Sequence, residues 1–350
     1  MTGKKKWILN LALLISSIGL TLYGVLHGEN LRLIWAIIRG ANPLYCLLAF
    51  GCMMLCILAE GGVIWYLMRA LSQRSRLRHC FLFSFVGFFF AAITPSATGG
   101  QPLQAYLMKK ADIPVSVSVP VLSVVTILYK SVLILISALV LMIRPALIMQ
   151  YLDPCLFWCY LGLMLNVALT GTLLLFIFRP ETMLDAASVI TAFIRDVLHV
   201  RRAAGWYPRI ERWCRKYEGV TKCFHRNGGK IAIAFGITCL QRLSLLLVTW
   251  YSCLALGFVR LNPLVVLTLQ AMVLSSADMM PLPGGTGVNE SLFLVMFTPL
   301  LGGVMDIPVM ILSRGLSYYS QIAVGGLLTV VAFCIFNRME KKREENDRLL

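Results

Sequence analysis

Long apolar stretches with few charged residues recur along this sequence and constrain its fold more than any other feature. A helix needs about 20 mostly apolar residues to cross a bilayer, and several stretches reach that length. Charged residues make up 14% of the 350 residues, whereas about 25% is usual in a soluble domain. The stretches lack the short alternating pattern of barrel strands. The sequence therefore predicts an all-α polytopic integral membrane protein.

We expect six full membrane spans and two apolar elements that are broken by glycine and proline. The broken elements, 81–108 and 264–301, are too interrupted to cross as single helices, so we expect them to be re-entrant. The whole chain, 1–350, then forms a single domain. It contains repeat one at 44–143, a basic loop at 179–230, repeat two at 231–336 and a charged tail at 337–350. The six expected spans are 7–26, 44–68, 115–143, 155–178, 231–256 and 308–336.

The second broken element has its break at residues 280–290, between two apolar runs that are each too short to cross a bilayer. Prolines and glycines there cannot continue a helix. A helix that begins near Val288 would point free N–H groups into the opening, which suits an anion. The alternative is a tight interfacial turn between two short helices. The residues that break the helix are Pro281, Pro283, Gly284, Gly285 and Gly287.

The first broken element has its break at residues 94–102 and carries basic residues on both flanks, Arg69–Arg78 before it and Lys109–Lys110 after it. Both flanks should therefore be cytoplasmic. The second element is entered from outside, and two broken elements of opposite orientation are typical of an inverted repeat in transporters. The repeated tetrapeptide at 112–115 and 306–309 supports this interpretation.

Positive charge indicates the orientation of the chain. Lys4–Lys6 place the N-terminus in the cytoplasm, and an even number of spans returns the tail there. The short segment 31–39 is amphipathic and should lie at the outer interface. The basic, aromatic loop 179–230 lies either on the anionic inner leaflet or in solvent as an orientation signal. RNA or tRNA binding by this loop is disfavoured, because it lacks a recognisable module.

Six ionisable residues fall within apolar segments, where each costs about 3 kcal/mol or more on insertion scales. They either pair with one another to hold the bundle together, or they line a polar cavity. In a cavity the cations can meet a phosphate, to which arginine offers two parallel hydrogen bonds. Glu290 either meets a cationic head group or pairs with Arg314. The six are Glu60, Lys130, Arg242, Asp278, Glu290 and Arg314.

Catalytic and cofactor motifs give no competing interpretation. The four histidines lie in loops or flanks, without a Ser-His-Asp context, and no Gly-Lys-Ser/Thr phosphate-binding loop is present. Cysteine and histidine spacings do not match a zinc site. We expect no catalytic residue, no metal and no cofactor.

The two glycine motifs resemble those of a known family. Residues 95–106, Pro-Ser-Ala-Thr-Gly-Gly-Gln-Pro-Leu-Gln-Ala-Tyr, and residues 281–290, Pro-Leu-Pro-Gly-Gly-Thr-Gly-Val-Asn-Glu, resemble the lysylphosphatidylglycerol synthase transmembrane family, the flippase-like domain of the multiple peptide resistance factor. Arg314 matches an arginine in the last helix of the family. The chain departs from the family pattern at Gln101 and Gln104, where many members have aspartate and arginine.

The resemblance implies a bacterial inner-membrane protein with both termini in the cytoplasm. In full-length family members this domain moves lysylphosphatidylglycerol to the outer leaflet. A separate C-terminal cytosolic domain makes that lipid from lysyl-tRNA and phosphatidylglycerol. We expect that catalytic domain to be missing here, because the chain ends 14 residues after Phe336.

We therefore expect a flippase-like protein that translocates or handles an anionic or aminoacylated phospholipid such as lysylphosphatidylglycerol. The alternatives are a phosphatidylglycerol lysyltransferase, or its membrane subunit, and an ion-coupled small-solute carrier. The expected partners are membrane phospholipids and a separately encoded lipid-modifying enzyme. The expected head-group and translocation residues are Pro95, Gly99, Gly100, Gln101, Gln104, Lys130, Arg242, Asp278, Pro281, Pro283, Gly284, Gly285, Gly287, Glu290 and Arg314.

Overall fold

The computed structural model describes residues 31–73, 75–178, 184, 188, 189, 191, 228–280 and 282–349. Every regular element in these ranges is a helix, and their one isolated β-bridge joins Pro95 to Pro283. The predicted all-α class is therefore confirmed. The expected span 7–26 and most of the basic loop, 179–227, lie outside the described residues.

Five helices of the described ranges are long and apolar enough to cross a membrane, and they coincide with the five expected spans in those ranges. The third of them starts earlier than expected, because α7 and the short η1 continue directly into α8. The last is α14, a π-helical turn η3, and α15. The elements are α3 (Pro43–Ala70), α6 (Val115–Ile143), α7 (Ala146–Leu152), η1 (Asp153–Cys155), α8 (Leu156–Phe178), α11 (Gly228–Ala255), α14 (Asp306–Arg314), η3 (Gly315–Tyr319) and α15 (Ser320–Leu349).

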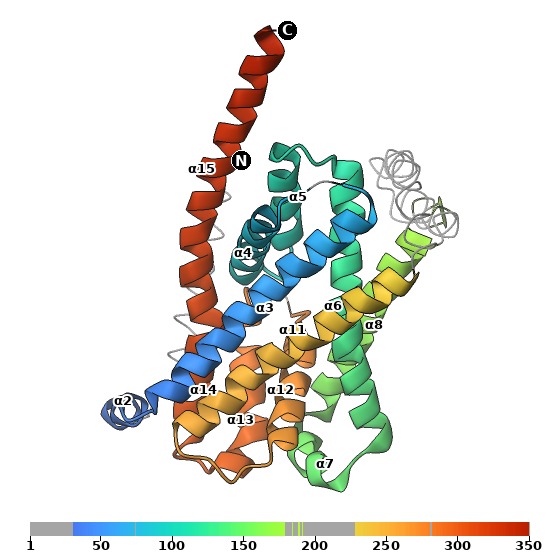
Figure 1. Cartoon of the computed structure of the whole chain (residues 1–350). Helices are drawn as coiled ribbons and strands as arrows, with labels where there is room; N and C mark the ends of the chain where they lie inside the picture. Colours follow the sequence, from blue (N-terminus) through green and yellow to red (C-terminus); the bar gives the residue numbers. More distant parts are fainter. Residues whose placement is uncertain are drawn as a thin grey trace.

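The two broken elements form helix pairs at opposite ends of the molecule. The first pair is α4 (Leu77–Ile93) and α5 (Gly100–Lys110), and the second is α12 (Pro263–Ala277) and α13 (Val288–Leu301). In Figure 1 the first pair occupies the upper end and the second pair the lower end, so each break lies in the interior. The amphipathic segment forms α2 (Leu31–Arg39), as expected, and lies across the lower end.

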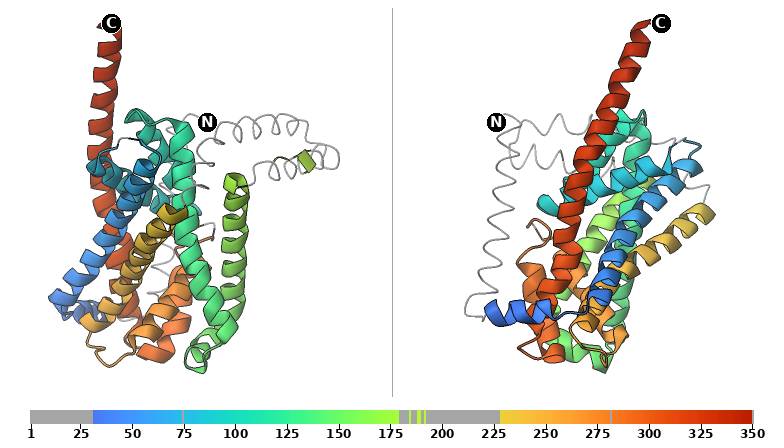
Figure 2. Two further views of the ribbon diagram at one scale, coloured as in Figure 1. Left: turned by 45° about the vertical axis from the view of Figure 1, so that its right-hand side comes forward. Right: turned by 60° about the vertical axis from the view of Figure 1, so that its left-hand side comes forward.

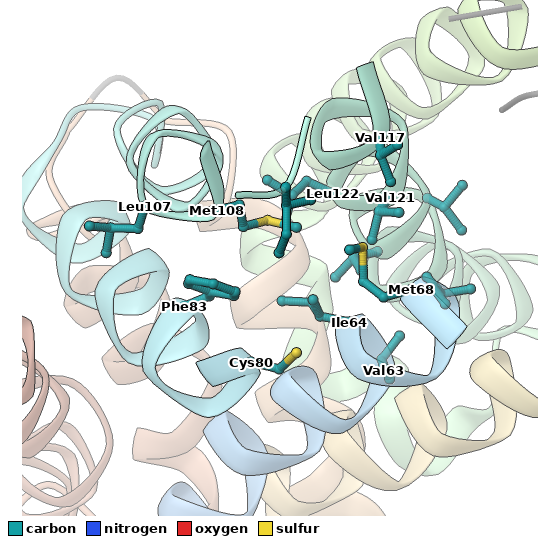
Figure 3. Close-up of a cluster of buried hydrophobic side chains, with 14 of the residues drawn as sticks. Val63, Ile64, Met68, Cys80, Phe83, Leu107, Met108, Val117, Val121 and Leu122 are labelled. Carbon is teal, nitrogen blue, oxygen red and sulfur yellow. The ribbon is translucent and has the colours of Figure 1, made fainter. Parts of the chain in front are cut away.

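The long helices α3 and α11 cross the molecule side by side and run antiparallel (Figures 1 and 2). Apolar side chains form one buried cluster at the upper end, where Ile64, Phe83 and Leu122 converge from α3, α4 and α6 (Figure 3). A second buried cluster surrounds α12 and α13 and includes Phe293 and Phe297. The two apolar clusters thus pack around the two helix pairs, the first around α4 and α5 and the second around α12 and α13.

Glycines let the helices approach closely, which is the usual basis of packing where lipid tails are as apolar as the side chains. A Cβ atom on Gly61 would lie 3.0 Å from the Cα of Phe81, so α3 and α4 touch there. A Cβ atom on Gly162 of α8 would lie 2.5 Å from the Cα of Ser276 on α12. These contacts hold both broken helix pairs against the long helices.

Candidate functional site

The two breaks share a sequence and a backbone shape. Each is a Pro-x-x-Thr-Gly turn, at Pro95–Gly99 and at Pro283–Gly287, and the next helix starts directly after the glycine. In both turns the second and third residues adopt positive φ angles, which L side chains rarely adopt. The angles are 50° at Ser96, 54° at Ala97, 59° at Gly284 and 64° at Gly285.

The threonine of each turn closes it in the same way. The Thr98 hydroxyl donates to the Pro95 carbonyl over 2.9 Å, and the Thr286 hydroxyl donates to the Pro283 carbonyl over 3.0 Å. Each of these carbonyls also accepts from the backbone N–H of the same threonine, over 3.2 Å at Pro95 and 3.1 Å at Pro283. Both turns therefore pair these carbonyl groups within the protein, where an unpaired backbone group is costly.

The tips of the two helix pairs touch each other. Pro95 and Pro283 form an antiparallel bridge, and the Ser96 hydroxyl donates to the Met280 carbonyl over 3.4 Å. The helix pair from one end of the molecule therefore meets the pair from the other end at this contact.

A cavity of about 480 Å³ lies beside this contact. It takes residues from both turns and from the long helices, and it brings together most of the residues that the sequence analysis expected. Pro95, Gly99, Pro283, Gly287 and Glu290 are not in its lining, and Pro281 lies outside the described residues. The expected residues that line it are Gly100, Gln101, Gln104, Lys130, Arg242, Asp278, Gly284, Gly285 and Arg314.

Lys130 is the most deeply buried of the cations, with 1% of its surface exposed. It forms an ion pair with Asp278 and donates to Asn166 Oδ1 over 2.9 Å. Asn166 donates in turn to the Ser275 carbonyl over 2.9 Å, so this side chain ties α8 to α12. The positive charge of Lys130 is therefore already balanced by the protein.

The positive charge of Arg314 is also balanced by a carboxylate of the protein. Its Nε donates to Glu290 Oε1 over 2.7 Å, and its Nη2 donates to the Gly284 carbonyl over 3.3 Å. The second Glu290 oxygen accepts from the Gly287 N–H over 2.7 Å. A carboxylate of the chain itself thus takes the favourable anion position at the start of α13. Of the two roles expected for Glu290, the structure shows the pairing with Arg314.

The first turn binds its neighbours through neutral amides. Gln101 donates to Thr126 on α6, and Gln104 donates to Glu60 Oε1 over 3.0 Å. Gln104 reaches Glu60 by crossing Gly87, where any Cβ atom would lie 2.1 Å from its amide nitrogen. Gln101 and Gln104 therefore make neutral contacts within the protein.

Arg242 differs from the other cations of the cavity. Its guanidinium lies over the ring of Tyr129, 4.5 Å from the centroid, and 9% of the residue is exposed. Within the described ranges its Nε has no hydrogen-bond partner, and no carboxylate forms an ion pair with it. An arginine stacked on an aromatic ring is held in place while its donors stay available.

Sequence reasoning missed Tyr129, Asn166 and Tyr318. Tyr318 donates to the Ala92 carbonyl over 3.0 Å, lies under the Arg314 guanidinium and packs on Gly284. It belongs to η3, and single π-helical turns are frequent at functional sites. Its distance of four residues from Arg314 places both on one helix face, and that spacing was the available signal.

The helices and the interior cavity define the class of the chain as a multi-pass helical membrane protein. The family model for the lysylphosphatidylglycerol synthase TM region matches residues 7–325, nearly the whole chain, and the chain belongs to this family. The resemblance seen in the two glycine motifs is therefore confirmed. No curated protein matches the chain.

Proposed function

We propose that the chain translocates an anionic or aminoacylated phospholipid, such as lysylphosphatidylglycerol, in the bacterial inner membrane. The head group passes through the cavity between the two turns while the acyl chains stay in the bilayer. Arg242 is the observation that carries the proposal, because no carboxylate of the described residues forms an ion pair with this cavity cation. A buried cation without a direct ion-pair partner is costly, and a ligand phosphate lowers that cost.

The charges of the cavity favour a phosphate at Arg242 over the other two cations. Lys130 and Arg314 each have an acidic partner, so an anion there would have to displace Asp278 or Glu290. The Arg242 guanidinium can offer two parallel N–H donors to the phosphate oxygens. Tyr129 fixes its plane from one side, so the phosphate approaches along the edge that faces the cavity.

The arrangement of the helix pairs supports alternating access through an inverted repeat. The two turns share one backbone shape, and they meet through an antiparallel bridge. Their neighbours correspond as well: α4 packs against α15 and α12 against α6, while α5 packs against α6 and α13 against α14. In this proposal the halves rock about the contact of the turns and open the cavity to each side alternately.

Positive charge supports an orientation with the α4–α5 end in the cytoplasm. Arg69, Arg76, Arg78 and Lys109 lie near the ends of helices there, and the charged C-terminal part of α15 extends from the same end (Figure 1). The head group would then enter between the turns from the side of the basic loops. A separately encoded lipid-modifying enzyme on that side would supply an aminoacylated substrate.

A leaflet-resolved flip assay in proteoliposomes tests this function. We expect the full chain to move phosphatidylglycerol or lysylphosphatidylglycerol faster than protein-free liposomes do, and we expect Arg242→Gln to lose that movement. Arg39→Gln is the matched control, since Arg39 stacks on Trp35 at the surface end of α2 and lines no part of the cavity. Equal rates for Arg242→Gln and the unmodified chain would refute the assignment.

A further inference from the structure

Glu60 is a buried carboxylate that the proposed head-group site does not use. It lies in the middle of α3 with 8% of its surface exposed, and it lines the cavity. Oε1 accepts from the Gln104 amide over 3.0 Å, and Oε2 accepts from the Gln241 amide over 3.5 Å. Both donors are neutral, and no cation in the described ranges forms an ion pair with Glu60.

The charged and titratable groups around Glu60 are few. The groups that interact with it electrostatically are Cys56 on its own helix, Tyr129 on α6 and Arg242 on α11, while α5 contributes the neutral Gln104. Arg242 is the positive charge among them, and it lies near Glu60 without touching it. Ionised Glu60 and Arg242 would balance each other's charge without forming an ion pair.

We propose that Glu60 binds a proton when the phosphate of a head group binds Arg242. The proposal rests on the proposed function, in which Arg242 receives that phosphate. A bound phosphate neutralises Arg242 and places a second negative charge near Glu60. The ionised carboxylate then loses the stabilising positive charge of Arg242 and is repelled by the phosphate. The proton comes from the hydronium ions or buffer of the surrounding solution and joins a carboxylate oxygen of Glu60, and no covalent bond of the lipid forms or breaks.

The absence of net charge in both states of the site makes this exchange favourable in the membrane interior. With an anionic head group such as that of phosphatidylglycerol, the empty site holds ionised Glu60 and Arg242, and the loaded site holds protonated Glu60 and an Arg242–phosphate pair. Both states have no net charge, so neither places an uncompensated charge in a poorly polarisable medium. Without the proton, the loaded site would carry one excess negative charge.

The two glutamines suit a carboxyl that changes its protonation state. An amide has both a donor and an acceptor end, so Gln104 and Gln241 can donate to the ionised form and, after rotation, accept from the protonated form. A lysine or arginine at either position would hold Glu60 ionised. The neutral Gln104, at which this chain departs from the family pattern, thus has a role in the exchange.

Linkage gives this proposal a measurable consequence. If one proton binds with each anion, anion affinity rises about tenfold for each unit by which pH falls, over the range in which Glu60 is ionised in the empty site. In liposomes, the head group and the proton move together. A pH gradient therefore drives the lipid toward the alkaline side.

Proton uptake on binding tests the proposal in the detergent-solubilised full chain. Short-chain phosphatidylglycerol is added in weak buffer with a pH indicator, and glycerol phosphate is added in a second arm to show whether acyl chains are needed. We expect about one proton taken up for each anion bound by the unmodified chain, and none by Glu60→Gln. Asp153→Asn is the control, since this acid is exposed in η1 and lines no part of the cavity, and it should keep the uptake.

The possible results separate this proposal from the proposed function. Binding without proton uptake, or uptake that Glu60→Gln leaves unchanged, overturns the role of Glu60 while the lipid site stands. Absence of binding to the unmodified chain overturns both. If Glu60→Gln does not fold, infrared difference spectra of the unmodified chain decide, since a protonated-carboxyl band should appear on lipid binding. An anion affinity that depends on sodium concentration and not on pH also refutes the proposal.

Discussion

Pro95 and Pro283, which lie in different halves of the chain, form an antiparallel bridge at the centre of the molecule. Each proline opens a turn with the same hydrogen bonds and the same left-handed residues. The shared Pro-x-x-Thr-Gly pattern aligns the two turns residue by residue, so that Ala97 corresponds to Gly285. That correspondence makes it possible to predict whether each of two substitutions raises or lowers the free energy of unfolding.

We expect Ala97→Gly and Gly285→Ala to change stability in opposite directions. Ala97 has a φ of 54°, where an L side chain costs about 1–2 kcal/mol. Glycine removes that cost but has more conformational entropy in the unfolded chain, so Ala97→Gly should stabilise the fold by up to about 1 kcal/mol. Gly285 has a φ of 64°, and a Cβ atom there would lie 3.0 Å from the Ala277 carbonyl oxygen. Gly285→Ala should therefore destabilise by about 1–2 kcal/mol.

Equilibrium unfolding in mixed detergent micelles measures both changes. Gly62→Ala is the control, because a Cβ atom at this position within α3 meets nothing within 4 Å and alanine favours a helix. A loss of stability in Ala97→Gly equal to that in Gly285→Ala would contradict the correspondence of the two turns.

We expect Arg314→Gln to lower the free energy of unfolding more than removal of the whole ion pair does. The Glu290 side chain is 4% exposed, so loss of its partner leaves a buried, uncompensated carboxylate at a cost of about 3–5 kcal/mol. The double variant Glu290→Gln/Arg314→Gln keeps polar groups of similar shape and should recover part of that loss. A double-mutant cycle of unfolding free energies measures the coupling, and additive losses would show that the pair contributes nothing.

We expect Gly162→Ala to separate α8 from α12, whereas Gly171→Ala on the same helix should be neutral or slightly stabilising. A Cβ atom on Gly162 would lie 2.6 Å from the Ser275 carbonyl oxygen, which accepts from Asn166, while one on Gly171 meets nothing within 4 Å. Overpacking typically costs about 1–3 kcal/mol. Because the contact also positions the partner of Lys130, the variant should lose flip activity as well. Unfolding and flip rates of the two variants test this directly.

The sequence predicted the helices well, because the length and hydropathy of each apolar stretch are local properties. The described spans coincide with the expected ones, and α13 starts at Val288 as expected. The joining of α7 to α8 was missed, because Asp153 and Pro154 look like a break yet form one tight turn of the same helix.

The partners of the buried charges were less predictable, since they depend on which helices meet. The pairing of Glu290 with Arg314 was one of two roles considered from sequence, but that of Lys130 with Asp278 requires knowing that α6 packs on α12. That no carboxylate of the described residues forms an ion pair with Arg242 depends on how all the helices pack, so no local sequence pattern indicates it. Tyr129 was overlooked because an aromatic residue in an apolar span looks like packing.

We expect Tyr318→Phe to weaken the link between the two halves without disturbing the Arg314 pair. The hydroxyl donates to the Ala92 carbonyl near the end of α4, so its loss leaves a buried acceptor at a cost of about 1–3 kcal/mol, while the ring still packs on Gly284. Tyr319→Phe is the matched control, because the described residues give the Tyr319 hydroxyl no hydrogen bond. If the halves rock during transport, Tyr318→Phe should also change the flip rate, whereas a change in unfolding free energy alone would assign Tyr318 a purely structural role.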